Sequence, residues 1–433
     1  MLDIKFILQN QNLLKKVIKN KKIELNLDEL INVYQSKNEL KLKLEKLQFH
    51  RNQITENLTK ASKEEKDNLI SEGKKIKEEI NSLEIKIKPL VEKFNQLMLQ
   101  VPNIYSDDTP VGESEKDNKE IFRWGTIPKF KFKAKDHLEL AKSLDLIDFD
   151  RGVKVSGFRG YFLKNEAVLM QLGLVWHAIK KMQKHGFQLM IPPTLVREFA
   201  LIGSGFFPFS KEEVYKIGNP HQLSEKNKEE IFLAGTAELP LLAYYADQVI
   251  NENNLPIKLC GFSPCYRSEI GSYGKDTKGI YRIHEFVKVE QLVICKSDLK
   301  ESNNWLEKMR KISEEMLQEL NLPYRVVAMC TADMGAGKYK MYDLETYMPS
   351  RNGYGETHSD SNLTDWQARR LNIKYKTKTG ETKFVYTLNN TVIASPRILI
   401  AILENYQKAD GSVEVPKILQ PYVGKKVIKT CII

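Results

Sequence analysis

The chain has 433 residues, of which 42% are hydrophobic and 28% charged, so it is long enough for two or three domains with a full-sized core. Its mean hydropathy is −0.42, and no apolar run approaches the roughly 20 residues of a membrane-spanning helix, which excludes an integral membrane protein. The net charge of +11 permits a polyanionic partner without requiring one.

The amino-terminal residues and the cysteines indicate where the protein works. A short apolar patch precedes the first lysines, which reverses the order of a secretory signal, and a mitochondrial presequence would be rich in Arg and Ser. We therefore expect a cytoplasmic protein. The cysteines form no C-x-x-C pair and have no histidine nearby at ligand spacing, which predicts free thiols and no zinc site. They are Cys260, Cys265, Cys295, Cys330 and Cys431.

Residues of about 28–101 have a heptad pattern. Seam residues recur at alternating steps of three and four from Leu30 to Ala61, and again from Leu69 to Val101. The polar break "KASKEEKD" between the two runs predicts an antiparallel helical hairpin, about 50 Å long at 1.5 Å per residue. Pro89 is expected to bend the second helix. Taken alone, the segment is typical of a dimerisation coiled coil, and its charges are nearly balanced.

The segment "VPNIYSDDTPVGESEKDN" ends the helices and predicts a linker. From about residue 120, apolar runs, turns and helical stretches alternate, which predicts an α+β domain with a substantial antiparallel sheet. We therefore expect one domain over residues 1–110, which carries the hairpin, and a second over residues 111–433.

Residues 264–286, "PCYRSEIGSYGKDTKGIYRIHEF", are typical of a β-hairpin with a polar loop. Alternation places Arg267 and Glu269 on one face of the first strand. On the return strand, a polar face is expected from Arg282, His284, Phe286, Lys288 and Glu290, and a core face from Tyr281, Ile283, Val287, Val289 and Val293. A solubility pattern would not need the aromatic ring. Guanidinium groups suit phosphates, a ring suits a base and carboxylates suit amines, so the pattern predicts a nucleotide site.

A second candidate segment is "LNNTVIASPRILIAILENYQ". Ser395 suits an N-cap and Pro396 the first helical position, so a helix is predicted to begin here. Arg397 then lies in the first turn, where the helix dipole disfavours a cation. Either it is a surface residue that tolerates a penalty under about 1 kcal/mol, or a bound phosphate supplies the missing anion. P-loop and Rossmann motifs are absent, so a nucleotide would be held by arginines on an antiparallel sheet.

Together these segments resemble the seryl-tRNA synthetases, class II aminoacyl-tRNA synthetases, in their bacterial or organellar form. "YRSE" with "RIHEF" resembles class II motif 2, "NNTVIASPR" motif 3 and "HGFQLMIPPTLV" motif 1, the dimer-interface element. "GTAELPL" and "YGETHSDSNLTDWQARR" resemble the serine enzyme, and the resemblance covers essentially the whole chain. It implies a class II antiparallel-sheet catalytic domain and an amino-terminal coiled-coil arm that binds tRNA.

The resemblance also implies an activity and its partners. The enzyme would activate L-serine with ATP and Mg²⁺ and transfer it to the 3′ end of serine tRNA, with selenocysteine tRNA as a further candidate acceptor. It would be a homodimer. Other readings stay open: a synthetase-like paralogue that charges another acceptor, a threonyl or prolyl enzyme, or a coiled-coil scaffold. The threonyl and prolyl enzymes carry an anticodon-binding domain after motif 3, whereas only 36 residues follow Arg397 here.

Residue roles follow from the matched motifs. Arg267 and Arg397 would be catalytic, the first on the α-phosphate and the second on the γ-phosphate or the adenine ring. The implied ATP-binding residues are Arg267, Ser268, Glu269, Ile283, Phe286, Glu356, Thr357, His358, Ser359 and Arg397. The implied serine-binding residues are Thr236, Ala237, Glu238, Arg282, Glu290 and Thr391. Glu269 would contact the adenine amino group, Phe286 would stack on the ring and Arg282 would hold the serine carboxylate.

The chain departs from the family pattern in two places. It has "ETHSDSN" where "EISSCSN" is more usual, and "NNTVIASPR" where "NGSGLAVGR" is usual. Thr391 then replaces a serine but keeps the hydroxyl. Glu356 and Ser359 are the implied Mg²⁺ ligands. Strict alternation would pair Glu356 with His358 instead, so the metal pair requires a bulge or turn.

Overall fold

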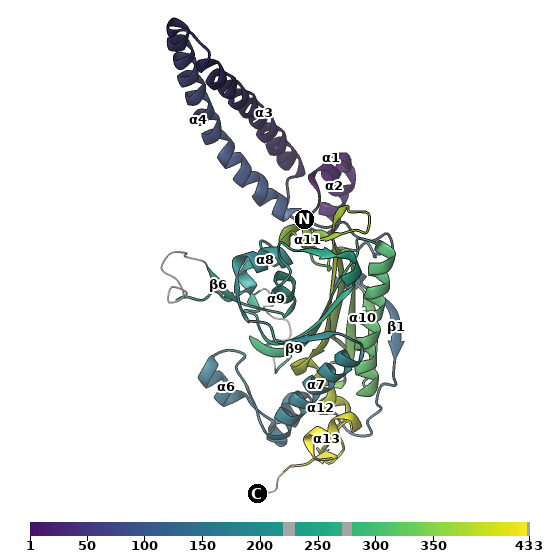
Figure 1. The fold of residues 1–433 in the computed structure, drawn as a ribbon. Coiled ribbons are helices and arrows are strands. Elements are labelled where there is room, and N and C mark those ends of the chain that lie inside the picture. Colours follow the sequence, from purple (N-terminus) through teal and green to yellow (C-terminus); the bar gives the residue numbers. More distant parts are fainter. Residues whose placement is uncertain (220–229, 271–278, 431–433) are drawn as a thin grey trace. The chain divides into compact units, whose positions relative to one another are not determined.

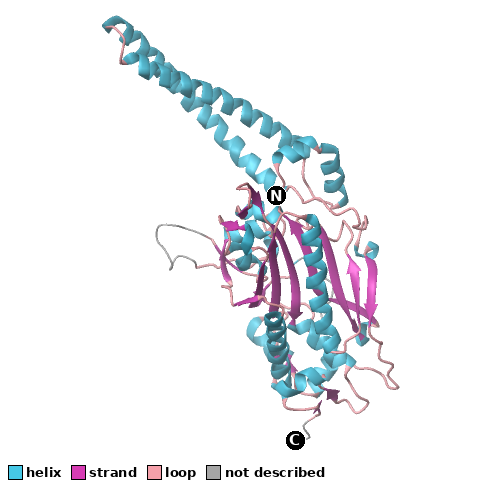
Figure 2. Cartoon of the chain, turned by 45° about the vertical axis from the view of Figure 1, so that its right-hand side comes forward, coloured by secondary structure: helices cyan, strands magenta, loops and turns pink. Residues whose placement is uncertain are grey.

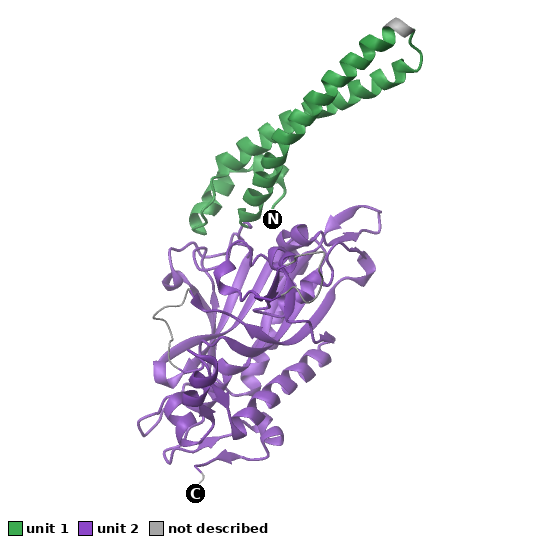
Figure 3. Ribbon diagram, turned by 90° about the vertical axis from the view of Figure 1, so that its left-hand side faces the viewer, with its two compact units in different colours: residues 1–102 green, residues 103–433 purple. Residues whose placement is uncertain are grey.

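The computed structural model describes residues 1–219, 230–270 and 279–430, without the side chains of residues 63 and 64 (Figure 1). Within it the chain forms two compact units, residues 1–102 and 103–433 (Figure 3). Most of the loop of the predicted β-hairpin, residues 271–278, lies outside the described residues, and so does Cys431.

Unit 1 is helical throughout. Its helices are α1 (Ile4–Gln9), α2 (Gln11–Asn20), α3 (Leu27–Leu58) and α4 (Lys63–Gln100). The side chain of Asn26 accepts a hydrogen bond from the Glu29 backbone N–H and caps α3. Ser62 and Glu65 form a capping box that begins α4 inside the predicted polar break. The predicted helical hairpin is therefore confirmed.

The seam of the hairpin is apolar along its middle and has a cation–aromatic contact where α3 begins and α4 ends. Ile54 of α3 is buried against Ile76 and Ile80 of α4. At the seam position of Lys37, the ammonium nitrogen lies 3.7 Å from the ring centroid of Phe94, so the stem packs while the charge meets a ring face. Helix α4 is continuous through Pro89.

Unit 2 is built on one large sheet (Figure 2). Its order is β1 (Lys119–Trp124), β10 (Tyr324–Ala328), β11 (Lys340–Met348), β12 (Gly353–Thr364), β15 (Tyr386–Ala394), β9 (Glu285–Cys295), β8 (Ile257–Tyr266), β4 (Gln188–Met190). Every neighbouring pair is antiparallel except β4 and β8, which are parallel. The predicted α+β class with an antiparallel sheet is confirmed.

Smaller elements complete unit 2. The additional strands are β2 (Ile147–Asp148), β3 (Phe162–Leu163), β5 (Leu195–Arg197), β6 (Ile231–Leu233), β7 (Val249–Asn251), β13 (Lys374–Lys376), β14 (Thr382–Phe384), β16 (Val413–Glu414) and β17 (Val427–Ile428). The helices are α5 (His137–Ser143), α6 (Phe149–Ser156), α7 (Asn165–Lys184), α8 (Glu198–Ser204), α9 (Glu238–Ala243), α10 (Leu299–Glu319), α11 (Trp366–Leu371), α12 (Ser395–Asn405) and α13 (Gln420–Val423).

The main core lies between the sheet and helices α7, α10 and α12. Strand β9 shows the arrangement: Val289 and Val293 are fully buried in this core, and Gln291 donates to the Met309 carbonyl of α10. Because side chains alternate across a strand, Lys288 and Glu290 must face the opposite side of the sheet. Helix α8 contacts α9 and α11. Helix α9 also contacts β8 and β9, and α11 contacts β12 and β15.

Two further findings concern the expectations from composition. In the described part of the chain, no helix has the length and apolar character needed to cross a membrane. Cys260, Cys265, Cys295 and Cys330 are buried free thiols.

Candidate active site

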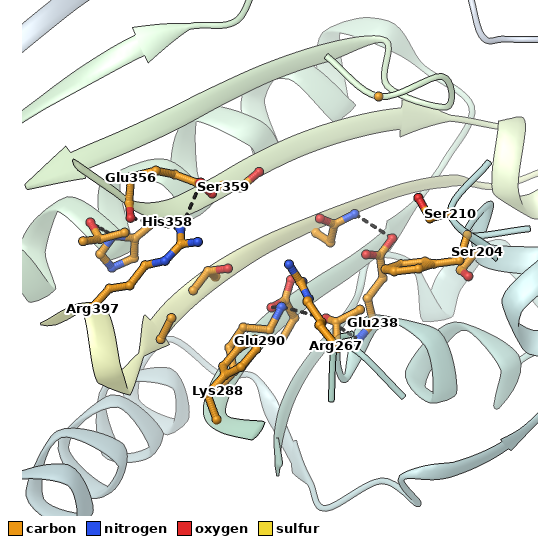
Figure 4. A pocket seen from close by; sticks show the side chains of 18 of the residues that line it. Ser204, Ser210, Glu238, Arg267, Lys288, Glu290, Glu356, His358, Ser359 and Arg397 are labelled. Atoms are coloured by element: carbon orange, nitrogen blue, oxygen red, sulfur yellow. Dashed lines mark hydrogen bonds and ion pairs between the residues drawn. The ribbon is translucent and has the colours of Figure 1, made fainter. Parts of the chain in front are cut away.

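A cavity of about 330 Å³ lies on the face of the sheet that carries Lys288 and Glu290 (Figure 4). It is lined by every predicted site residue except Ser268 and Ala237. In the figure, Glu356 and Arg397 lie at one end and Glu238 at the other, with Arg267 between them. The volume is in the range of small-molecule sites.

Arg267 reaches the cavity from the end of a strand. Strand β8 ends at Tyr266, but the hairpin ladder continues, because Arg267 N donates to the His284 carbonyl at 2.9 Å. The Arg267 side chain donates from Nε to the Gly235 carbonyl at 3.2 Å, and its guanidinium lies 5.6 Å from the ring centroid of Phe286. The ring expected to stack on a base is thus already covered by a cation.

The predicted alternation fails just ahead of β9. That strand begins at Glu285, so Arg282 and His284 are not strand residues. The His284 ring bonds the Arg267 carbonyl at 3.0 Å and does not line the cavity. Tyr281, which the alternation placed on the core face, does line it, and so does Ile283, for which the family resemblance implied contact with the nucleotide. A loop conformation has no period of two, which is why the pattern fails there.

Arg282 and Glu269 form a pair within this loop region. Arg282 Nη1 lies 3.1 Å from Glu269 Oε2, while Arg282 Nε is buried without a hydrogen-bond partner among the described residues. Glu269 adopts a left-handed conformation with φ of 54°, which is uncommon for a residue other than glycine. A partly buried guanidinium with an unused donor can bind a carboxylate or phosphate oxygen.

Arg397 lies in the first turn of α12, as predicted. Its Nη1 donates to the Glu356 carbonyl at 3.0 Å and lies 2.9 Å from Glu356 Oε2, and its Cζ lies 4.6 Å from the Tyr281 ring centroid. Glu356 therefore supplies the anion that offsets the helix dipole in this structure. Burial alone would raise the pKa of Glu356, but Arg397, with Arg267 and Arg282, holds that pKa below its usual range.

The predicted N-cap role of Ser395 is wrong. Ala394 occupies the cap position, and Ser395 is the first residue of α12. The Ser395 hydroxyl instead donates to Gln171 Oε1 of α7 at 2.5 Å, a tertiary contact that replaces the local one.

A β-bulge in β12 brings four consecutive residues to the cavity. Leu344 of β11 pairs with His358 and Glu345 pairs with Glu356, so Thr357 is the extra residue. The bulge required by the proposed pairing of Glu356 with Ser359 is present, and Glu356, Thr357, His358 and Ser359 all line the cavity.

His358 is buried in this bulge. Its Nδ1 lies 2.9 Å from Thr357 Oγ1 and its Nε2 lies 3.1 Å from the Val392 carbonyl. Burial lowers the pKa of His358 to about 4, so the imidazole is neutral near pH 7. A carbonyl only accepts, so Nε2 carries the proton that is donated to Val392. Asp360, the other unusual residue, is fully buried and does not line the cavity.

The opposite end of the cavity is built around buried carboxylates. Glu238 Oε1 accepts from Gln367 Nε2 at 2.7 Å and from Asn389 Nδ2 at 2.8 Å. These two amides fix the orientation of a carboxylate that is 6% exposed. Thr391, on the strand beside Glu290, is 7% exposed and also lines this end.

Two predicted residues lie just outside the cavity. The Ser268 hydroxyl donates to the Glu212 carbonyl at 2.7 Å, which ties the hairpin to a neighbouring loop. Ala237 is fully buried at the start of α9 and packs against Gly261 of β8. Both therefore support residues that line the cavity.

Sequence reasoning missed several lining residues, chief among them Lys288, Trp366, Asn389 and the loop 335–338. Lys288 was placed on the correct face, but no signal showed that it contacts a second element. Asn389 and Trp366 lie inside the motifs "NNTVIASPR" and "DWQARR", but the family resemblance implied site roles for other residues of those motifs and not for these two.

The chemistry available at the site is positional and electrostatic. One end of the cavity presents two guanidinium groups and an aromatic ring. The other end presents carboxylates and hydroxyls, which suit the polar groups of a small amino acid. No group of three or more His, Cys, Asp or Glu side chains within the described ranges could hold a metal ion by itself.

The sequence matches two protein-family models: "Seryl-tRNA synthetase N-terminal domain" over residues 1–105 and "tRNA synthetase class II core domain (G, H, P, S and T)" over residues 216–406. The chain is 42% identical to a serine–tRNA ligase of Treponema denticola, over 98% of this chain and 99% of that protein. It is also 42% identical to a serine–tRNA ligase of Deinococcus radiodurans, over 99% of each.

Two solved structures are similar over nearly the whole chain. A seryl-tRNA synthetase from Pyrococcus horikoshii complexed with ATP has a TM-score of 0.90 at 38% identity, covering 99% of this chain and 100% of that one. A cytoplasmic serine–tRNA ligase from Naegleria fowleri in complex with AMP has a TM-score of 0.84 at 30% identity, covering 98% and 96%. On this sequence identity, coverage and structural likeness, the chain belongs to the seryl-tRNA synthetase family.

Proposed function

We propose that this protein activates L-serine with ATP to form seryl-adenylate and then transfers serine to the 3′ end of serine tRNA. The observation that carries the proposal is the single cavity that joins Arg267 and Arg397 to the buried carboxylates Glu238 and Glu290. The names of the relatives agree, since those proteins are serine–tRNA ligases, and two of the similar structures hold ATP or AMP.

ATP would occupy the end of the cavity with the arginines. Phe286 offers a ring for the adenine once the guanidinium of Arg267 moves from it to the α-phosphate. Glu269 would accept from the adenine amino group. Arg397 is held over Tyr281 and beside Glu356, where it suits the γ-phosphate or the outer face of the base. Ile283, Thr357 and His358 would line the nucleotide pocket, with Ser268 as support.

Serine would occupy the end with the carboxylates. The unused Nε donor of Arg282 fits the serine carboxylate, and Glu238, held by two amides, fits its ammonium group. Glu290 and Thr391 face each other on neighbouring strands and would contact the hydroxyl. Thr236 lies between these groups, and Ala237 sets the position of the loop that carries it.

The residues beside Glu356 fit a magnesium ion. Asp343, paired with Ser359 across the strands, is buried and has an Oδ1 atom without a hydrogen-bond partner in the described part of the chain. Mg²⁺ prefers oxygen ligands and is usually bound through one or two carboxylates together with substrate phosphates, so Glu356 and Ser359 would hold it. When bound, it would neutralise charge on the ATP phosphates.

The reaction needs no nucleophile from the protein. A serine carboxylate oxygen attacks the α-phosphorus in line and pyrophosphate leaves. Arg267 and Arg397 stabilise the charge that develops on the phosphates, and the cavity holds the two reactants at the correct distance. The terminal adenosine hydroxyl of the tRNA then attacks the activated carbonyl and releases AMP.

Residues 1–110 would form the tRNA-binding domain and residues 111–433 the catalytic domain, with the α3–α4 hairpin as a coiled-coil arm that grips the tRNA. Its nearly balanced charge favours recognition by shape and a few backbone contacts. The catalytic domain would form a homodimer in the cytoplasm, where four buried free thiols are compatible with reducing conditions. Exposed apolar side chains support the dimer: Trp176 of α7 is 51% exposed and Ile191, just after β4, is 81% exposed.

Amino-acid-dependent exchange of pyrophosphate into ATP tests the proposal. Across the standard amino acids, serine alone should support rapid exchange by the purified full-length protein. Exchange that depends on another amino acid, or none at all with active ATP and Mg²⁺, would contradict it.

A further inference from the structure

Lys288 is a buried cation at the serine end of the cavity. Its ammonium nitrogen lies 2.7 Å from Thr236 Oγ1 and 2.5 Å from Glu290 Oε2. The side chains of Lys288 and Glu290 are only 7% and 3% exposed. Both of its partners are residues that the proposed function assigns to serine, and all three line the cavity.

The contact with Lys288 decides what the Thr236 hydroxyl can do. Thr236 Oγ1 accepts from Lys288 Nζ and also from the Glu238 backbone N–H at 3.3 Å. A hydroxyl oxygen has two acceptor sites and one proton, so with both sites occupied it can only donate to a further partner. Thr236 is therefore fixed as a donor towards the cavity.

The same contact acts on the charge of Glu290. Burial raises the pKa of this carboxyl above its usual value, and the Lys288 ammonium limits that rise. The other charged groups that act on Glu290 are Glu238 of α9, which raises its pKa, and Lys338 of the loop after β10, which lowers it. The thiols of Cys260 and Cys265 on β8 lie near it, and burial raises their pKa values, that of Cys260 to about 12, so both stay neutral.

We propose that Lys288 is a positioning residue for serine recognition: its ammonium holds Glu290 as an anion with one oxygen engaged, and leaves the other oxygen to accept the serine hydroxyl. The inference rests on the proposed function. The Lys288 ammonium, at 2.5 Å, is the ion-pair partner of Glu290, and Lys338 adds a smaller lowering of the pKa of this carboxyl. Discrimination between serine and alanine then depends on a residue that touches neither the hydroxyl nor ATP.

The test is Lys288→Met, which keeps the length of the side chain and removes its charge. In pyrophosphate exchange by the full-length protein, the KM for serine should rise by about 10- to 100-fold, the size of one lost hydrogen bond to a charged group. The KM for ATP should stay unchanged, and the preference for serine over alanine should fall. Between about pH 6 and pH 9 the serine KM of the variant should fall more steeply than that of the wild type, because Glu290 then ionises only at higher pH.

Lys181→Met is the matched control. Lys181 is also buried and ion-paired, to Glu315 and Glu319, but it lies on α7 away from the cavity. This variant should leave the serine KM and its pH dependence unchanged. If Lys288→Met behaves like Lys181→Met, or raises the KM values for serine and ATP equally, Lys288 is a structural residue only and the inference is overturned.

A double variant keeps the test decisive if Lys288→Met does not fold. Lys288→Met with Glu290→Gln leaves no unpaired buried charge and is compared with Glu290→Gln alone. If Lys288 acts mainly through Glu290, the serine KM of the two proteins differs only by the smaller effect of losing the contact with Thr236. A further rise in the double variant as large as that expected for Lys288→Met in the wild type overturns the inference. A wild-type protein that does not activate serine would instead overturn the proposed function.

Discussion

At the scale of single residues, the charges that the reaction needs are in place before any ligand binds. Arg397 is paired with Glu356, and Arg267 lies over Phe286. When a nucleotide binds, each arginine therefore exchanges its present partner for a phosphate, and no further charged side chain of the protein has to be buried. Once the guanidinium of Arg267 has moved from the ring to the α-phosphate, both arginines are in position before the chemical step. Groups fixed before that step stabilise its transition state without a further cost of reorganisation.

This arrangement predicts the effect of removing either arginine. Arg267→Ala and Arg397→Ala should each lower serine-dependent pyrophosphate exchange by orders of magnitude, since one such contact is worth roughly 3–4 kcal/mol in the transition state. Circular dichroism should show an intact fold. Arg123→Ala, a half-exposed arginine outside the cavity, is the control and should exchange normally. Near-normal exchange by either cavity variant would remove that residue from the site.

Selectivity is a second property at this scale. Buried groups that hydrogen-bond the serine hydroxyl are left unpaired by alanine, so alanine should be rejected by about 10⁴-fold in kcat/KM for activation. Threonine must be excluded sterically, and Thr391→Ser, which removes a methyl group at a 7% exposed position, should admit it more readily. Activation of alanine within about tenfold of serine would make the assignment of Thr236, Glu238 and Glu290 wrong.

At the scale of elements, some local features could be predicted from the sequence and others could not. A bulge or turn in β12 could be expected only through the family resemblance, which pairs Glu356 with Ser359 where strict alternation would separate them, and a bulge is present. The start of the return strand could not be predicted, since no local sequence signal marks Glu285 as the first residue of β9. Ser395 is a good capping residue in isolation, but its partner Gln171 is 224 residues away. Likewise, period-two alternation placed Lys288 on a face without indicating its contact with Thr236.

Helix α8 gives a prediction at this scale. It ends at Gly205, whose φ of 91° is left-handed and whose added Cβ would lie 2.3 Å from Trp366 Cζ3. Trp366 is 1% exposed and lies under the Arg370 guanidinium at 3.7 Å, so it cannot yield easily. Gly205→Ala should therefore add an overpacking cost of about 1–3 kcal/mol to the backbone strain. Exchange activity should fall as well, because Gly205 and Trp366 both line the cavity.

Gly424→Ala separates the two costs. Gly424 ends α13 in the same left-handed conformation, with φ of 72°, but an added Cβ would meet nothing within 4 Å. It should show the strain alone, and its exchange activity should be unchanged. Equal losses of unfolding free energy in the two variants, measured by denaturant titration, would refute the role of Trp366.

At the scale of the whole molecule, the chain divides into a helical unit of residues 1–102 and a catalytic unit of residues 103–433. The heptad pattern was sufficient to predict the hairpin, because both seams repeat over many turns. It was not sufficient to predict its role, since a dimerisation coiled coil has the same pattern. The match of residues 1–105 to the seryl-tRNA synthetase N-terminal domain places the hairpin in that family, and tRNA binding is the role proposed for it.

This division predicts separable activities. Replacement of residues 30–100 with a short linker should leave a dimer that still forms seryl-adenylate, because every lining residue of the cavity lies in the second unit. Transfer to tRNA should become very poor, mainly through a raised KM for tRNA. Sedimentation and charging assays check both points. A truncated protein that is monomeric would restore the dimerisation reading, and one that charges tRNA at the full rate would remove the arm from tRNA binding.

The central claim is that serine and ATP react in this cavity, and the enzyme-bound product tests it most directly. The full-length protein is incubated with ATP, Mg²⁺ and an equimolar mixture of the standard amino acids without tRNA, and the bound small molecules are identified by mass spectrometry. Seryl-adenylate should be the one adenylate recovered, and it should be absent from the Arg267→Ala protein. Recovery of another aminoacyl-adenylate, or of seryl-adenylate in equal amount from Arg267→Ala, would contradict the account.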